Sequence, residues 1–181
     1  FQAAAGGGGG NYELVGTTNT LDTSTYTYDS YHLTFSSIDM TNVTGLQVYA
    51  SVPMDINSIG FRVNGLTADY AYNGNVVYNA GTNTYFGSNS ADGFFLGHWR
   101  IGNESEAFNF WIQCDESGES DMLEFAGMGT GQGSAYDRTG CSWAGGRQNT
   151  DTTQAVTSVS CIEDGIDILA GGRLTVYKVT R

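Results

Sequence analysis

The segment Gly45-Leu-Gln-Val-Tyr-Ala-Ser-Val52 decides the fold class of this chain. Its aliphatic residues alternate with Gln47, Tyr49 and Ser51, so they fall on one side of an extended backbone. This alternation is typical of a strand with one face in a core and the other toward solvent. The segment Phe108-Asn-Phe-Trp-Ile-Gln-Cys114 repeats the pattern. Both segments therefore predict half-buried β-strands.

On either side of these two segments, further runs of strand-forming residues are separated by turn dipeptides such as Asn64-Gly65 and Asn73-Gly74. The additional predicted strands are Tyr12–Gly16, Tyr31–Ser37, Ile59–Val63, Val76–Tyr78, Phe94–Ile101, Gln154–Ile162 and Arg173–Thr180. Helical periodicity is weak, and its best candidate is a turn or two over Asp121–Gly127. The glycine-rich stretch 127–153 is expected to form surface loops. Residues 11–181 thus predict an all-β single domain, an antiparallel β-sandwich resembling a jelly roll.

Composition excludes several classes of function. The chain has 181 residues and a formal net charge of -12, with only 7 Lys and Arg residues. So few scattered cations cannot form the basic stripe that binds phosphates, and direct binding of nucleic acid is not expected. No run approaches the roughly 20 apolar residues of a membrane-spanning helix, so no membrane span is expected.

The residues also give little support to catalysis, and we expect a protein that is not an enzyme. No GxSxG elbow occurs, and only two histidines are present. The carboxylates between Cys114 and Glu124 are expected to form a solvated loop face, and they lack the DxDxDG pattern of a calcium loop. No catalytic residue, cofactor or metal site is therefore predicted. The three cysteines are expected to be small buried thiols, with a Cys141–Cys161 disulfide as the alternative.

The first ten residues, Phe1–Gly10, form a glycine-rich arm that contains the sequence AAAGGGGG. Such a composition behaves as a flexible coil unless something holds it. Fully extended, it reaches roughly 33–36 Å, enough to cross onto an adjacent subunit. We expect subunit contacts from Phe1, Gln2, Ala3, Ala4 and Ala5; the alternative is a linker ordered only by crystal or particle packing.

Aromatic residues lie in segments rich in Asn, Thr and Ser. Tyrosine combines a flat apolar face with a polar tip, which suits either a subunit interface or a sugar-binding surface. The candidates for ligand or interface contacts are Trp111, Tyr70, Tyr72 and Tyr78. Trp111 falls on the polar phase of its strand and is the best candidate for an exposed indole. The interface is favoured over the sugar site, and the structural alternative is that all three tryptophans belong to the core.

Three blocks of the sequence, in this order, resemble a family of structural proteins from marine tailed phages. They are Phe35-Ser-Ser-Ile38, Arg62-Val-Asn-Gly65 with Asp69-Tyr70 downstream, and the closing strand Gly171–Val179 with its G-x-x-L-x-x-Y pattern. The chain departs from the family at Val63, Leu66 and Lys178, where Phe, Asp and Gly are usual. The resemblance covers roughly half of the chain in three blocks.

This resemblance implies a virion component that is assembled in the host cytoplasm. It implies a head decoration or cement protein, or a fibre-like part of the tail, whose partners are other virion proteins. No catalytic residues accompany the family. We expect a symmetric homo-oligomer, with a trimer favoured. The alternative function is a receptor-binding or carbohydrate-binding tail module whose partner is a glycan of the host surface.

Overall fold

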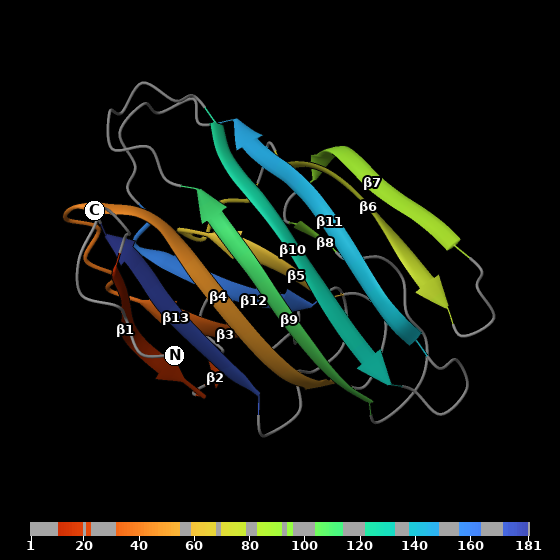
Figure 1. The fold of residues 1–181 in the computed structure, drawn as a ribbon, viewed down its shortest axis with the longest axis horizontal. Helices are drawn as coiled ribbons and strands as arrows, with labels where there is room; N and C mark the ends of the chain where they lie inside the picture. Colours follow the sequence, from red (N-terminus) through yellow and green to blue (C-terminus); the bar gives the residue numbers. More distant parts are fainter. Residues whose placement is uncertain are drawn as a thin grey trace.

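The structure is a computed structural model in which every described regular element is a β-strand (Figure 1). It describes residues 11–19, 21–22, 32–54, 59–67, 70–78, 83–91, 94–95, 104–113, 122–132, 138–148, 156–163 and 172–180. The strands are β1 (Asn11–Thr18), β2 (Leu21–Asp22), β3 (His32–Ser36), β4 (Val43–Met54), β5 (Ile59–Val63), β6 (Tyr70–Tyr78), β7 (Asn83–Ala91), β8 (Phe94–Phe95), β9 (Glu104–Gln113), β10 (Met122–Gln132), β11 (Arg138–Gln148), β12 (Ser158–Glu163) and β13 (Arg173–Thr180).

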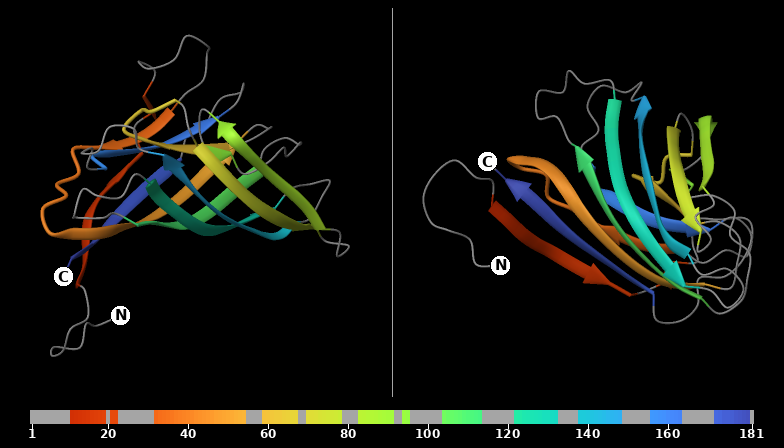
Figure 2. Two further views of the ribbon diagram at one scale, coloured as in Figure 1. Left: turned by 90° about the horizontal axis from the view of Figure 1, so that it is seen from above. Right: turned by 45° about the vertical axis from the view of Figure 1, so that its right-hand side comes forward.

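The strands form two antiparallel sheets packed face to face, which confirms the expected β-sandwich. The large sheet has eight strands in the order β1-β13-β4-β9-β10-β11-β6-β7, and the small sheet has five in the order β2-β3-β12-β5-β8. Figure 1 shows the large sheet in front of the small one, and Figure 2 shows the two layers from the side.

The pairing also confirms the jelly-roll character. β1 pairs with β13, β3 with β12, β4 with β9 and β5 with β8, so the pairs nest from the outside of the chain inward. β13 then pairs with β4, and β12 with β5. This is the arrangement of one long hairpin rolled up into two four-stranded sheets, which defines a jelly roll. The first and last described strands are therefore neighbours in the large sheet.

Two hairpins are added to this eight-stranded framework. β6 and β7 come between β5 and β8 in the sequence, and β10 and β11 come between β9 and β12. In space, the β10–β11 hairpin continues the large sheet beyond β9, and β6 pairs with β11 to extend it further. Both insertions thus widen one sheet and leave the order of the jelly-roll strands unchanged (Figure 2).

The core lies between the sheets and consists of the inward-facing residues that the alternation predicted. Leu46, Val48 and Ala50 on β4 and Phe108, Phe110 and Ile112 on β9 are all buried. Phe61 on the small sheet joins the two layers. Its ring centroid lies 5.8 Å from that of Phe108 and 4.4 Å from that of Phe110. Burial of these apolar surfaces is the main force that holds the sheets together.

The predicted turn at Asn64-Gly65 is present after β5. Asn64 and Gly65 have φ angles of 52° and 65°, a left-handed conformation that Asn and Gly adopt most easily. The Leu66 amide donates to the Val63 carbonyl across the turn, at 3.0 Å. The Asn64 side chain also accepts hydrogen bonds from the Thr157 and Ser158 amides, at 2.8 and 3.1 Å. The turn therefore ties the end of β5 to the start of β12.

Three local predictions were wrong. Within the predicted helical segment Asp121–Gly127, residues 122–127 are not helical, because β10 begins at Met122 and pairs along β9. Much of the stretch 127–153 is not loop but belongs to β10 and β11. Asn73-Gly74 is not a turn, since both residues lie inside β6. In each case pairing with a strand distant in sequence overrides the local signal.

Glycine inside these strands permits close approach of the backbones. A Cβ atom at Gly145 would lie 2.3 Å from the Ala71 carbonyl oxygen and 2.6 Å from the Tyr72 Cα atom on β6. A larger residue would therefore push β11 away from β6. The glycines of this region mark tight contacts between strands, a role that glycine also has within sheets.

Cys161 is a thiol buried in the core and forms no disulfide. This corrects the alternative of a Cys141–Cys161 disulfide and agrees with the expected buried thiol at this position. Within the described ranges, the structure contains no helix of the length and apolarity that a membrane crossing requires.

Candidate binding surface on the large sheet

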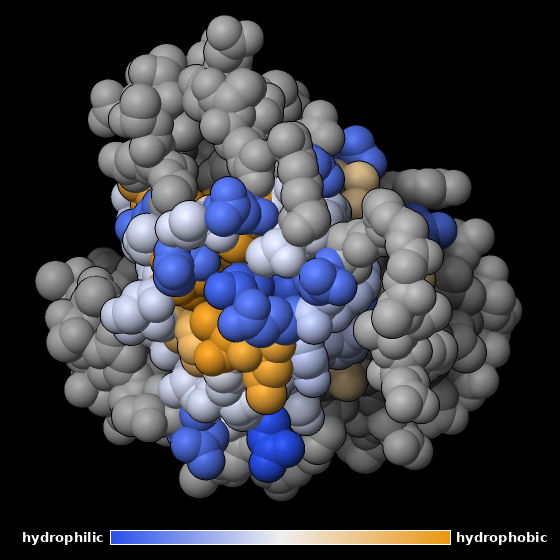
Figure 3. Space-filling model, turned by 60° about the vertical axis from the view of Figure 1, so that its left-hand side comes forward, coloured by the Kyte–Doolittle hydropathy of each residue, from blue (hydrophilic) through white to orange (hydrophobic). Residues whose placement is uncertain are grey.

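The outer face of the large sheet, which points away from the small sheet, carries exposed apolar side chains. Tyr12, Leu14, Tyr49 and Met128 are 66%, 54%, 44% and 64% exposed. Register places all four on this face, because directly paired residues of neighbouring strands share a face. Tyr49, for example, alternates with buried Val48 and Ala50 and pairs with Asn109, which in turn pairs with Met128. Figure 3, which turns the left-hand side of the molecule forward, shows an apolar area bordered by hydrophilic residues.

One row across three strands combines two aromatic rings with an amide. Gln47 on β4 pairs with Tyr177 of β13 on one side and with Trp111 of β9 on the other. The Tyr177 ring also packs edge-to-face against Tyr49, with centroids 5.8 Å apart and an interplanar angle of 82°. We call Gln47, Tyr49, Asn109, Trp111 and Tyr177 the aromatic platform. All five are uncharged.

Trp111 is held in place by a glycine and a hydrogen bond. A Cβ atom on Gly45 would lie only 2.1–2.7 Å from three carbon atoms of the Trp111 indole. The indole therefore lies directly over the Gly45 backbone, where no side chain intervenes. Its Nε1–H donates to the Gln113 Oε1 atom at 2.9 Å. The side chain is partly exposed, so the ring is fixed without being buried.

The amides of the platform are also ordered. Gln47 Nε2 donates to the Phe110 carbonyl at 2.9 Å and to Asn109 Oδ1. Among the described residues, neither Gln47 Oε1 nor Asn109 Nδ2 has a hydrogen-bond partner, and the same holds for the hydroxyls of Tyr49 and Tyr177. The platform thus presents polar donors and acceptors beside flat apolar rings.

The structure places the predicted aromatic residues differently from one another. Trp111 lies on the outer face, as its phase in the strand predicted. Tyr70 does not: it is completely buried between the sheets, and its hydroxyl accepts a hydrogen bond from the Val63 amide at 3.0 Å. Tyr72 is partly buried and packs against the core. Tyr78 ends β6, and its side chain lies outside what the structure describes.

Tyr70 and Tyr72 were expected at the surface because their neighbours in sequence are polar. Their real phase follows from pairing, since Tyr72 pairs with Gly145, Gly145 with Phe125 and Phe125 with buried Ile112. The exposed face instead uses Tyr12, Tyr49 and Tyr177. The alternation of residues 45–52 identifies Tyr49 as an outer-face residue, because Tyr49 falls on the opposite side of the strand from Leu46 and Val48.

Strand β1 forms one edge of the large sheet. It pairs with β13, and in the described part of the chain no strand pairs with its other side. Asn11, Tyr12, Glu13 and Leu14 are all exposed. The Lys178 ammonium lies 3.4 Å from the Glu13 carboxylate. We call residues 11–14 the β1 edge. The predicted contact residues Phe1, Gln2, Ala3, Ala4 and Ala5 are separated from it in sequence by Gly6–Gly10 and lie outside the described residues.

The outer face of the small sheet is different in character. Arg62 and Ser160 alternate with core residues and point away from the core, yet they are only 3% and 7% exposed. They are paired in register, and the Ser160 hydroxyl lies 3.0 Å from that of Thr34 on β3. These two residues form a polar, covered part of this face, whereas Ser36 on the same face is exposed.

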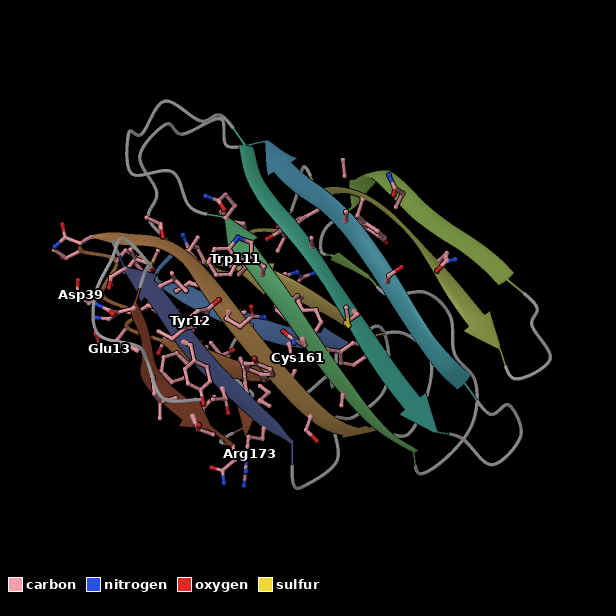
Figure 4. The ribbon with its side chains drawn as sticks, in the orientation of Figure 1. Tyr12, Glu13, Asp39, Trp111, Cys161 and Arg173 are labelled. Atoms are coloured by element: carbon pink, nitrogen blue, oxygen red, sulfur yellow. The ribbon has the colours of Figure 1, made fainter. Side chains whose placement is uncertain are left out.

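A carboxylate with a perturbed pKa lies in the turn before β4. Asp39 Oδ1 accepts hydrogen bonds from the Thr41 amide at 3.0 Å and from the Thr41 hydroxyl at 2.8 Å. The amide bond, followed by the hydroxyl bond, lowers the pKa of Asp39 below its ordinary value, with a smaller contribution from the charge of Lys178. Asp39 is fully exposed, which fits a local turn rather than a desolvated catalytic acid (Figure 4).

Among the residues described here, no group of three or more His, Cys, Asp or Glu side chains is close enough to hold a metal ion. The features that stand out are the aromatic platform and the β1 edge. Figure 4 shows Trp111 on β9 and Tyr12 on β1, both in front of the large sheet.

Comparison with known proteins found no family model that matches the sequence, and no curated protein matched it either.

Proposed function

We propose that this chain is a non-enzymatic structural protein of a tailed-phage virion, which binds other capsid or tail subunits. The role would be that of a head decoration or cement protein, or of a fibre-like component. The resemblance of three sequence blocks to phage structural proteins supports the virion assignment. The observation that carries the binding function is the exposed β1 edge, on which the apolar side chains of Tyr12 and Leu14 are exposed.

An edge strand has a row of backbone amides and carbonyls that can pair with another chain. Proteins that remain monomeric usually keep such strands short, charged or interrupted by proline. β1 has eight residues and contains no proline; it carries one charged side chain, Glu13, which pairs with Lys178 of the same chain, and Tyr12 and Leu14 on it are 66% and 54% exposed. Strand addition by a neighbouring subunit would satisfy the edge and bury both side chains. We propose a homo-oligomer, with a trimer favoured, as the resulting assembly.

The arm of residues 1–10 is proposed to strengthen this contact. It joins β1 directly, so a subunit bound along the β1 edge would meet the arm where it leaves the sheet. A chain segment that reaches roughly 33–36 Å could then extend across the partner. Contacts from two segments of one chain are expected to bind more tightly than either alone.

The experiment compares the full chain with two variants, deletion of residues 1–10 and Leu14→Lys. Sedimentation velocity and light scattering measure the oligomeric state, and circular dichroism measures the fold. Both variants should stay folded and shift toward monomer. Met128→Lys is the matched control, because it places the same charge at a side chain that is 64% exposed on β10, away from the edge. Unchanged assembly of Leu14→Lys would contradict the role of the edge.

The virion assignment has its own test. Particles of the phage that encodes this chain are purified on a density gradient and analysed by quantitative mass spectrometry. The proposal predicts the protein in a fixed copy number per particle, and less of it in particles grown with the Leu14→Lys gene. Particles that lack the protein entirely would overturn the virion role without affecting the edge contact.

A further inference from the structure

We propose that the aromatic platform is a binding site for an uncharged carbohydrate. This inference goes beyond subunit assembly, since it concerns a ligand site on the open face of the large sheet rather than its edge. It rests on the juxtaposition of Trp111, Gln47 and Tyr177 in one row across three strands.

The Trp111 ring is held in one orientation. One face of the indole covers Gly45, and the indole N–H is engaged by Gln113. The ring therefore keeps its orientation, and the face that points away from Gly45 is the part available to a ligand. Sugar rings have apolar C–H faces that pack on such flat aromatic surfaces. A ring that is already fixed loses little conformational entropy when a ligand stacks on it.

Hydrogen-bonding groups surround that ring. Carbohydrate hydroxyls both donate and accept hydrogen bonds, so a site that recognises them needs donors and acceptors within reach of the stacking surface. Gln47 Oε1 and Asn109 Nδ2 supply an acceptor and a donor, and the hydroxyls of Tyr49 and Tyr177 supply both. Two strand spacings separate Tyr177 from Trp111, so their backbones are about 10 Å apart. The row can therefore contact more than one sugar unit of an oligosaccharide.

The charge of the platform selects the class of ligand. The five platform residues are uncharged, and the chain as a whole carries a net charge of -12. Anionic ligands such as sulfated or sialylated glycans and nucleic acids would meet repulsion with no cation on the platform to offset it. A neutral polyhydroxylated ligand meets none. A proline-rich peptide could also stack on aromatic rings, but it would leave most of the platform's hydrogen-bonding groups unused.

The probes are neutral oligosaccharides of glucose, mannose, galactose and N-acetylglucosamine on an array, with sulfated and sialylated glycans and a proline-rich peptide beside them. The best neutral oligosaccharide is then titrated into ¹⁵N-labelled protein, in which the indole N–H signal of Trp111 is assigned with Trp111→Phe. The inference predicts binding of a neutral oligosaccharide and a shift of this signal. Binding of none of the neutral probes, or stronger binding of an anionic glycan or of the peptide, would overturn it.

Variants then locate the site. Trp111→Ala should weaken binding about tenfold or more, which corresponds to about 1.4 kcal/mol. Gly45→Ala is more specific, because its added methyl group would displace the Trp111 ring while leaving every platform residue present; it should weaken binding several-fold. Ser142→Ala, an exposed change on β11, is the control and should bind normally. Equal binding by Trp111→Ala and Ser142→Ala would overturn the assignment.

The two proposals fail separately. Leu14→Lys should lose assembly and keep oligosaccharide binding, whereas Trp111→Ala should lose oligosaccharide binding and keep assembly. Loss of assembly without loss of oligosaccharide binding in Trp111→Ala, with the fold retained, would show that the platform is a subunit contact and not a carbohydrate site.

Discussion

The outer faces of the two sheets reverse the usual relation between polarity and exposure. On the small sheet, Arg62 and Ser160 are polar and buried; on the large sheet, Tyr49 and Met128 are apolar and exposed. Large apolar side chains gathered on an open surface commonly mark a site of interaction. The small sheet's outer face therefore contributes to the stability of the domain, while the large sheet's outer face is available for binding.

The largest loss of stability is expected from a substitution on the inner side of the small sheet. Phe61→Ala should lower the free energy of unfolding by about 3–5 kcal/mol, because it removes the ring that joins the layers and leaves a cavity against Phe108 and Phe110. Urea denaturation monitored by circular dichroism measures the change. A loss below about 1 kcal/mol would show that the sheets are held together elsewhere.

Two arginines, one on each outer face, allow the contributions of the two faces to stability to be compared. Arg62→Ala on the covered face should lower the free energy of unfolding by about 2 kcal/mol or more, since it removes a buried side chain and its interactions. Arg173→Ala is the matched control, because Arg173 is exposed on the outer face of the large sheet. It should change stability by about 0.5 kcal/mol or less. Equal effects of the two substitutions in urea denaturation would break the distinction.

On the open face, the Tyr49–Tyr177 pair should contribute only modestly. A double-mutant cycle with Tyr49→Ser and Tyr177→Ser is expected to give a coupling energy of about 0.5–1.5 kcal/mol, the range for an edge-to-face pair. Thermal and urea denaturation of the four proteins measure it. A coupling energy of several kcal/mol would mean that this face stabilises the domain as strongly as the covered one.

The smallest expected effect concerns pH and the turn that leads into β4. Because the pKa of Asp39 is lowered in the folded protein, ionised Asp39 adds stability above its unfolded pKa, and this stability is lost as the pH falls through the folded pKa. Asp39→Ala should therefore be less stable than wild type at pH 6, and the difference should shrink between about pH 5 and pH 3. Unfolding curves across that range test the sign. A difference that grows on acidification would contradict it.

How far the sequence predicts the structure depends on whether the signal is local. The alternation in residues 45–52 and 108–114 identifies the central strands and the orientation of Tyr49 and Trp111. Asn64-Gly65 identifies a turn through its backbone preference. The β10–β11 hairpin escaped prediction because glycines lack the side chains that make alternation visible, and Tyr70 was misplaced because its orientation depends on pairing with residues far along the chain.

The candidate site was predictable in part for the same reason. Trp111 could be placed on an outer face from its own strand. Its neighbours Tyr177 and Gln47 come from strands that meet only after the chain has rolled up, and the Gly45 contact depends on the register between β4 and β9. No local pattern contains that information.

The position of the two inserted hairpins has a consequence for how such a domain can diversify. The eight jelly-roll strands pair with one another without β6, β7, β10 and β11. The connections that carry these two hairpins can therefore lengthen or shorten while the order of the jelly-roll strands stays the same. Proteins that descend from one ancestor could therefore differ in the width of the large sheet. New binding partners could then arise through heritable changes in the width of the sheet, and not only through changes in the tips of loops.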